Sequence, residues 1–377
     1  MEPRLNIPQI AHAIKAHGYT QAALAERIGV QPAAVTQWLK GETQPLPQRL
    51  LKLSLLLELS FDDLFIRTEP LQPAPVVAYR KRAGNTTTEN EMEHAREKGR
   101  LLRPLATYLP NQLLKPAEFR DPSLEYSYVE HAVRDLRKTL GIQEDDAVGY
   151  QHLIGTFSEL GAVIIPVMWG KKDAHGNALH ILLPESGATW IYLNLDSNAC
   201  DFNFWMAHEL AHVFTPKLAG SDAGEDFAEE FAGALLFPES ASEKLYDGII
   251  GKSAPVIINT IKRVAKERTI SFYTVVKRLN RYAENRGLKD FTQHKSAFFG
   301  ASKNFEKSFP LISEALFPDG KPDAADYISE NESVFKTPIY NIMRQYLTDS
   351  AHGAGWLAEV MDISLIDAKA LYQALIN

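Results

Sequence analysis

The sequence predicts a multidomain protein in which an all-α helix-turn-helix domain precedes an α+β domain and a helical C-terminal region. Residues 20–40 have the spacing of two short helices joined by a glycine turn. Strand-like runs at 162–168, 178–183 and 189–195 precede two apolar helical stretches, which predicts a small sheet packed with helices. Beyond Pro238 only helical periodicity is found. The expected segments are a helix-turn-helix domain at 1–67, a linker and charged helix at 68–115, the α+β domain at 116–290 and the helical region at 291–377.

Composition places the chain among ordinary globular proteins. Its 377 residues are 45% hydrophobic and 23% charged, which is enough material for two or three domains with their own cores. No apolar run approaches the ~20 residues that span a bilayer, so we expect no membrane partner. A single cysteine excludes an internal disulfide framework. These observations predict a cytoplasmic protein.

The first domain has the signals of a DNA-binding helix-turn-helix. Thr20 is placed to cap the first helix, Gly29 allows the turn and Pro32 suits the first position of the second helix. The second helix of such a motif enters the major groove with its N-terminal side chains toward the bases. We expect contacts with a DNA operator from Gln31, Ala33, Ala34, Thr36 and Gln37, with Lys40 toward a phosphate.

The charge of this domain bears on how it binds. Residues 1–67 carry seven basic and six acidic side chains, a net charge of only +1. Because phosphate neutralisation supplies most non-specific affinity, a homodimer on two half-sites is the expected DNA-binding species. The alternative is a small helical protein-interaction module that binds no DNA.

The segment that follows is expected to be a stiff linker and a solvated helix. Pro70, Pro73 and Pro75 predict the linker, and Thr88 is a possible cap for a charged helix at 89–108. Basic side chains at Arg80, Lys81, Arg82, Arg96, Lys98, Arg100 and Arg103 are interleaved with glutamates. This pattern favours a solvated helix face over a set of phosphate contacts.

The motif His-Glu-x-x-His lies inside an apolar helical stretch at residues 204–214. On a helix, His208 and His212 project from one face and can bind a single zinc ion through imidazole nitrogens. Glu209 lies beside them, where it can take a proton from water at the metal. The motif therefore predicts a zinc peptidase centre with Glu209 as its catalytic base.

A catalytic zinc site needs a third protein ligand and an open fourth position. Glu225 begins the next apolar helix, which stops at Pro238, and is the expected third ligand. Asp226 and Glu229 are its rivals. In a simpler interpretation, Glu225 and Asp226 are N-terminal charges favoured by the helix dipole.

These residues resemble the ImmA/IrrE metallo-endopeptidases that carry an N-terminal Cro/repressor-type helix-turn-helix. The family's second motif is matched in register by Glu225, Ala228, Phe231, Ala232, Leu235, Leu236 and Pro238. The strand at 190–194 ends in asparagine as in the family, and Tyr79, Arg80 and Lys81 resemble a short aromatic-basic element of it. Glu229 stands where the family usually has Asn or Asp, which leaves the partner of a histidine ligand uncertain.

The resemblance implies a transcription regulator whose peptidase domain cleaves a protein substrate after stress. That substrate would be a repressor or a toxin-antitoxin component, bound by strand addition at the sheet edge beside the metal. The alternative is a non-proteolytic regulator or antitoxin whose metal domain senses a ligand or binds a partner. An intact Glu209 favours the enzyme, because a domain that only binds has no need of the base.

Four further residues have open roles. His180, Tyr192 and Tyr246 are candidate oxyanion donors of the kind that such peptidases use, but a structural role is preferred for each. Cys200 lies eight residues before His208, and its thiolate could close the open zinc position. We prefer to interpret it as a small residue ahead of the helix.

Overall fold

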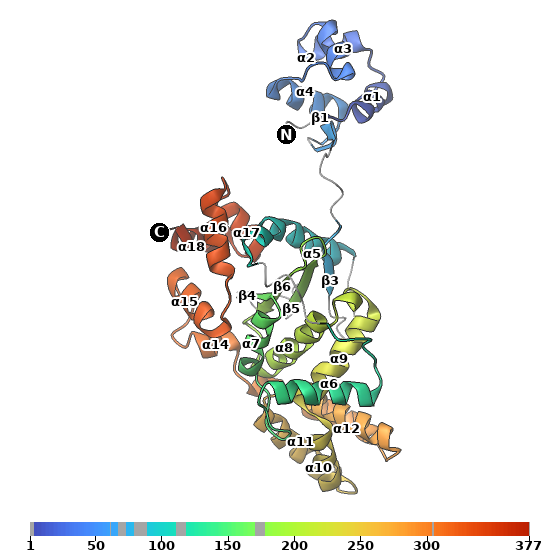
Figure 1. The fold of residues 1–377 in the computed structure, drawn as a ribbon, viewed down its shortest axis with the longest axis vertical. Coiled ribbons are helices and arrows are strands. Elements are labelled where there is room, and N and C mark those ends of the chain that lie inside the picture. Colours follow the sequence, from blue (N-terminus) through green and yellow to red (C-terminus); the bar gives the residue numbers. More distant parts are fainter. Residues whose placement is uncertain are drawn as a thin grey trace. The chain divides into compact units, whose positions relative to one another are not determined.

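A computed structural model describes residues 4–60, 62–66, 73–78, 89–110, 118–169, 178–303 and 305–376. The chain forms two compact units, Met1–Gln72 and Pro73–Asn377 (Figure 1). The expected aromatic-basic element at Tyr79, Arg80 and Lys81 and the cap at Thr88 lie outside the described residues.

The first unit is the helix-turn-helix that the sequence predicts. Thr20 Oγ1 accepts a hydrogen bond of 3.1 Å from the Ala23 amide and caps the second helix, and Gly29 ends that helix at φ 83°. Val35 and Trp38 are buried in the core. The helices are α1 (Ile7–Ala16), α2 (Gln21–Ile28), α3 (Pro32–Lys40) and α4 (Pro47–Leu57), followed by the 3-10 turn η1 (Asp62–Leu64). Two short strands, β1 (Arg4–Leu5) and β2 (Phe65–Ile66), pair antiparallel.

The second unit is built on a four-stranded mixed sheet in the order β3-β5-β6-β4. Its strands are β3 (Val76–Ala78), β4 (Ala162–Val167), β5 (Ala178–Leu183) and β6 (Ala188–Asn194). β4 runs parallel to β6, and the other neighbours are antiparallel. The three strands expected from the sequence are present. The fourth, β3, lies in the segment that we expected to be a linker, directly after Pro75.

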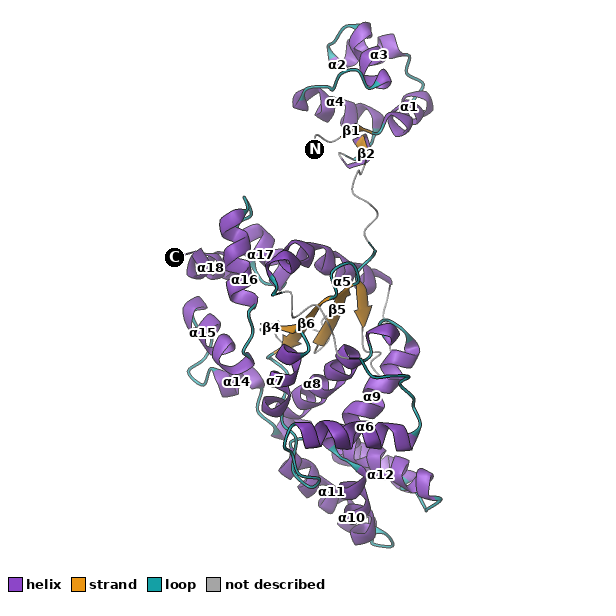
Figure 2. Ribbon diagram, viewed as in Figure 1, coloured by secondary structure: helices purple, strands orange, loops and turns teal. Residues whose placement is uncertain are grey.

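Side chains of β6 alternate between two cores, because successive residues of a strand point to opposite faces. Ile191 and Leu193 belong to the core beneath one face. Trp190 and Tyr192 belong to the core above the other. Both faces of the sheet are therefore covered by helices (Figure 2).

One face packs against the helices that carry the His-Glu-x-x-His motif and Glu225. α8 (Ala199–Phe214) contacts β5 and β6, and α9 (Asp222–Leu236) packs beside α8. Other helices of this core are α6 (Tyr126–Thr139), α7 (Tyr150–Glu159), α10 (Glu239–Ile249), α11 (Ala254–Arg268), α12 (Phe272–Arg286) and α13 (Lys295–Ser302). The 3-10 turn η4 (Pro216–Leu218) joins α8 to α9.

The opposite face is covered by elements from both ends of the unit. They are α5 (Glu89–Leu102), η2 (Arg103–Tyr108), α16 (Ile339–Asp349), α17 (Ala354–Met361) and α18 (Leu365–Ile376). α14 (Ile312–Leu316) and α15 (Ala324–Phe335) precede them. Segments from the expected ranges 68–115, 116–290 and 291–377 therefore pack around one sheet. The domain boundaries expected at 115 and 290 stay predictions. Among the described residues, no helix is both long enough and apolar enough to cross a membrane.

The charged helix differs from expectation in two ways. α5 ends at Leu102, before Pro104, and continues only as the 3-10 turn η2, because proline cannot extend an α-helix. Lys98 is 3% exposed, so the expected solvated face is wrong for this residue. Its Nζ lies 2.8 Å from Asp362 Oδ2 and 4.7 Å from the centre of the Trp169 ring. Lys98 thus ties α5 to the end of α17.

Candidate metal centre and nucleic-acid interface

The two motif histidines lie deep in the second unit. α8 begins at Asn198, whose side chain accepts a hydrogen bond from the Asp201 amide, and it is buried against the sheet for most of its length. His208, Glu209 and His212 are 2%, 3% and 1% exposed, respectively. Buried polar groups on an apolar helix are costly unless they have partners. Their partners come from α9 and β5.

Glu225 of α9 faces both histidines. Its Oε2 lies 3.4 Å from His208 Nε2, and its Oε1 lies 3.4 Å from His212 Nε2. The two Nε2 atoms are 3.2 Å apart. The Nε2 atoms of both histidines therefore face the carboxylate of Glu225. In the described part of the chain, Nδ1 of each histidine has no hydrogen-bond partner.

This donor set fits a metal ion. One ligand atom from each of His208, His212 and Glu225 lies within 4.8 Å of the others. Two imidazole nitrogens and a carboxylate are a zinc ligand set, and three protein ligands leave one tetrahedral position for water or substrate. The three side chains could therefore hold one metal ion and leave one coordination position open.

A close contact at the start of α9 places Glu225. Ser221 Oγ accepts a hydrogen bond of 3.1 Å from the Gly224 amide and caps the helix. A Cβ atom on Gly224 would lie 2.3 Å from the carbonyl oxygen of Leu218, so only glycine permits this approach. The first turn of α9 therefore packs tightly on the connection from α8, with Glu225 toward the histidines.

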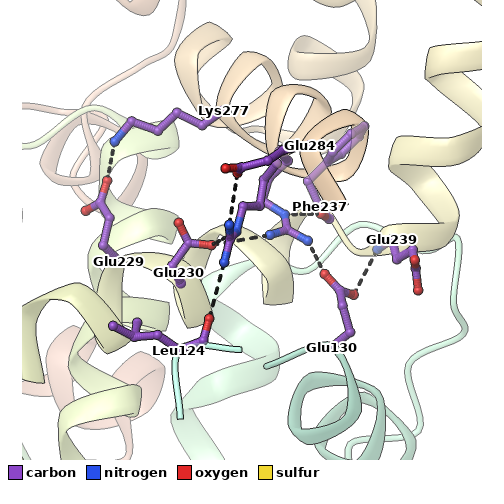
Figure 3. A network of polar contacts seen from close by, with 10 residues as sticks. Leu124, Glu130, Glu229, Glu230, Phe237, Glu239, Lys277 and Glu284 are labelled. Atoms are coloured by element: carbon purple, nitrogen blue, oxygen red, sulfur yellow. Dashed lines mark hydrogen bonds and ion pairs between the residues drawn. The ribbon is translucent and has the colours of Figure 1, made fainter. Parts of the chain in front are cut away.

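The rivals of Glu225 point elsewhere. Asp226 is exposed. Glu229 accepts a 2.5 Å hydrogen bond from Lys277 of α12 (Figure 3). Glu229 therefore joins α9 to α12.

The charge of the site favours a cation. Burial raises the pKa of Glu225, but the adjacent His208 and His212 outweigh burial and bring that pKa down to about 2. Burial disfavours the charged form of His212, yet Glu225 and Glu209 outweigh it and raise the pKa of the imidazole. The carboxylate of Glu225 is thus ionised at neutral pH and available to a metal.

Glu209 is beside the ligand cluster but outside it. Its Oε2 lies 3.4 Å from Nδ1 of His180, which projects from β5. The cluster of potential ligands among the described residues contains His208, His212 and Glu225 without Glu209. A buried carboxylate next to a metal centre, and not committed to it, has the placement of a general base.

The other candidates lie away from the centre. Tyr192 donates a 2.9 Å hydrogen bond to the Val360 carbonyl on the opposite face of the sheet. Tyr246 donates one of 2.9 Å to the Lys289 carbonyl. The thiol of Cys200 is buried at the start of α8, donates to Asn198 Oδ1 at 2.9 Å and is not in the ligand cluster. Burial raises the pKa of this thiol, which matches a small core residue better than a zinc switch.

The edge strand on this side of the sheet is β3, a strand that the sequence did not predict. Val76 of β3 pairs with Leu182 of β5, and Ala78 pairs with His180. A Cβ atom at Gly220 would lie 3.3 Å from the Val77 carbonyl, so the connection before α9 packs on β3 from outside. β5 is therefore an inner strand, and a peptide added at this edge would pair with β3. The sequence did not show this because a three-residue strand after Pro75 gives no alternating pattern.

A cavity of about 570 Å³ lies between α8, α9 and α12. It begins at Phe204 and Glu229, which are one helical turn from His208 and Glu225. Charged side chains form much of its wall: Asp201, Glu229, Glu230, Glu284 and Asp290, with Lys277, Arg278 and Arg281. Sequence reasoning did not identify this cavity, because α12 contributes to it from outside the two motifs.

A polar network fixes α12 beside this cavity (Figure 3). Arg278 is 3% exposed, pairs with the buried Glu130 of α6 and donates a 3.1 Å hydrogen bond to the Phe237 carbonyl. Arg281 pairs with Glu230 and Glu284. Arg278 and Glu130 form a buried ion pair, which favours one packing arrangement of α12 on α6.

In the first unit, α3 presents a mixed set of side chains. Gln31, Ala33, Gln37 and Lys40 are exposed, whereas Ala34 and Thr36 are half-buried. Thr36 Oγ1 donates a 3.0 Å hydrogen bond to Gln21 Oε1 at the start of α2. Gln37 is therefore better placed than Thr36 to read a base edge, since the hydroxyl of Thr36 already has a partner.

Comparison with known proteins identifies the first unit only. Residues 10–64 match a protein family described as helix-turn-helix. No curated protein and no solved structure matches the chain. The match supports a DNA-binding regulator. It ends before the second unit, so the resemblance of that unit to the ImmA/IrrE peptidases stays a prediction.

Proposed function

We propose that this DNA-binding regulator carries a zinc endopeptidase of the ImmA/IrrE kind and cleaves a protein target such as a repressor or antitoxin-like regulator. The observation that carries the proposal is the convergence of His208, His212 and Glu225 on one point, with Glu209 beside them. DNA binding by the first unit and cleavage by the second would act on the same regulatory circuit.

Each residue has a defined task in this proposal. His208 and His212 supply neutral imidazole nitrogens, and Glu225 supplies an ionised carboxylate to hold the zinc. Zinc supplies a Lewis acid that lowers the pKa of water to about 7 and polarises a peptide carbonyl. Glu209 accepts the proton from the attacking water and passes it to the leaving peptide nitrogen.

The burial of Glu209 favours an enzyme over a binding domain. A carboxylate that is 3% exposed and is not a metal ligand costs stability, because it has lost its hydration. A domain that only senses a ligand or binds a partner gains nothing from it. Costly polar groups that break the local packing rule are expected at functional sites.

The walls of the cavity suggest the character of the substrate. The cavity is lined by Phe204 and Glu229, one helical turn from His208 and Glu225, and would receive part of a peptide substrate. Its wall carries charges of both signs, most of them in ion pairs within the protein, and would suit a polar segment. An exposed loop or linker of a regulator has that composition, whereas an apolar core segment does not.

Reconstitution tests the proposal. The purified chain with one equivalent of zinc is incubated with the product of a neighbouring regulatory gene, and the products are separated by mass spectrometry. We expect a single cut that requires zinc and is absent with Glu209→Gln. Stable binding of the intact partner without any cut, by wild type and variant alike, would support the non-proteolytic regulator instead.

A further inference from the structure

His180 is a buried histidine that the proposed reaction does not use. It is 1% exposed and lies in β5, where it pairs with Ala78 of β3 on one side and with Ile191 of β6 on the other. Its ring centre is 5.6 Å from that of His212. The side chain thus projects from a doubly paired strand toward α8.

One atom of His180 faces one atom of Glu209. Nδ1 lies 3.4 Å from Oε2, and neither atom has a conventional hydrogen-bond partner elsewhere in the described residues. A buried carboxylate needs a donor, and a buried imidazole N–H needs an acceptor. The two requirements are met together if His180 carries its proton on Nδ1.

We propose that His180 is a positioning residue for Glu209: its Nδ1–H donates to Oε2 and holds the carboxylate so that the other oxygen faces the metal centre. The proposal rests on the proposed function, in which Glu209 is the base. It differs from the oxyanion role considered for His180, because Nδ1 is directed at Glu209. A separation of 3.4 Å is longer than the ~2.9 Å of a good N–H···O bond, and catalytic hydrogen bonds tighten when a site is loaded.

The sheet explains why His180 can do this. A carboxylate at the end of a flexible side chain occupies several rotamers unless a fixed group restrains it. β5 is fixed on both sides, because β3 pairs with it at His180 itself. The strand that closes the sheet edge therefore also gives Glu209 a rigid support.

The test is spectroscopic and needs neither zinc nor a substrate. The metal-free full chain is labelled with ¹⁵N-histidine, and the His180 signal is assigned as the one that disappears in His180→Asn. We expect a protonated Nδ1 in slow exchange with water. Glu209→Gln, which replaces the carboxylate acceptor by an amide, should shift this signal, whereas the matched change Glu225→Gln should move it far less. A proton on Nε2, or a signal indifferent to Glu209→Gln, overturns the proposal.

Zinc binding provides the second arm. His180→Leu removes the donor at similar volume, and His180→Asn places an amide N–H near the position of Nδ1. Both should retain one zinc per chain, since His180 is not a ligand; loss of zinc from a folded His180→Asn overturns the proposal by making His180 a ligand. If the hydrogen bond between His180 and Glu209 is present in a wild-type chain that neither binds zinc nor cleaves a protein, the proposed function fails while the positioning of Glu209 stands. Cleavage without the contact overturns the positioning alone.

Discussion

Nε2 of His208 lies 3.4 Å from Oε2 of Glu225, although the two residues belong to different helices and are separated by the turn η4. The contact depends on the close packing of α9 on this connection at Gly224. The ligand set is therefore a product of tertiary packing, and the pattern His-Glu-x-x-His supplies only two of its three members.

Zinc content tests the ligand set. Wild type should bind one zinc per chain, and His208→Ala and Glu225→Ala should lose it, because each removes one of three protein ligands. Asp226→Ala is the matched control, since Asp226 is exposed one residue away and should leave zinc unchanged. Elemental analysis after dialysis measures this. Full zinc in Glu225→Ala would show that the third ligand has been misassigned.

DNA binding tests the role of α3. Gln37→Ala should weaken binding to the operator by about 1–3 kcal/mol and leave binding to random duplex nearly unchanged, because an exposed glutamine reads a base edge and not a phosphate. Gln9→Ala, an exposed glutamine on α1, is the control and should have no effect. Fluorescence anisotropy with both duplexes gives the two affinities. Equal losses on both would argue against base reading by this helix.

Elements with strong local signals could be predicted from the sequence. Thr20, Gly29 and Pro32 mark the helix-turn-helix through caps and turn geometry, which are set by neighbouring residues. The apolar run around His208 predicts α8, which is buried on nearly every side, and the helical spacing after Glu225 predicts α9.

Elements that depend on distant partners could not be predicted. β3 is three residues long and becomes a strand only because β5 offers it a free edge. Lys98 looks like one more charge on a solvated helix until Asp362, 264 positions away, is known to lie beside it. The same holds for His180, whose partner Glu209 is on another element.

Cys200 should be unreactive in the folded protein. Burial raises the pKa of its thiol, so the folded state keeps the proton while an unfolded thiol ionises near pH 8.5. The Cys200 thiol therefore makes its full contribution to the free energy of unfolding below that pH, and this contribution falls as the pH rises above it. Alkylation by iodoacetamide should stay slow between pH 7 and pH 9 and become complete in denaturant. Rapid labelling of the native chain that releases zinc would instead support a role as a metal ligand.

Lys98 should matter for stability more than its neighbours do. Lys98→Met should lower the free energy of unfolding by about 2 kcal/mol, less than the ~3–5 kcal/mol for a fully buried pair because the Asp362 side chain is 26% exposed. Arg100→Met, which breaks exposed pairs on the same helix, should cost under about 1 kcal/mol. Urea unfolding followed by tryptophan fluorescence compares them. Equal costs would mean that the buried pair contributes no more than a surface one.

The most direct test of the proposed peptidase is Glu209→Gln in cells, with new protein N-termini identified by mass spectrometry after stress. The amide keeps the size and helix of the wild-type residue and leaves all three ligands in place, but it cannot accept a proton. We expect the variant to retain zinc and DNA binding while the cleavage rate falls by ~10² to 10⁴, so that a new N-terminus of one regulator appears with wild type and not with the variant. The same N-terminus at equal abundance with both proteins would contradict peptidase activity through Glu209.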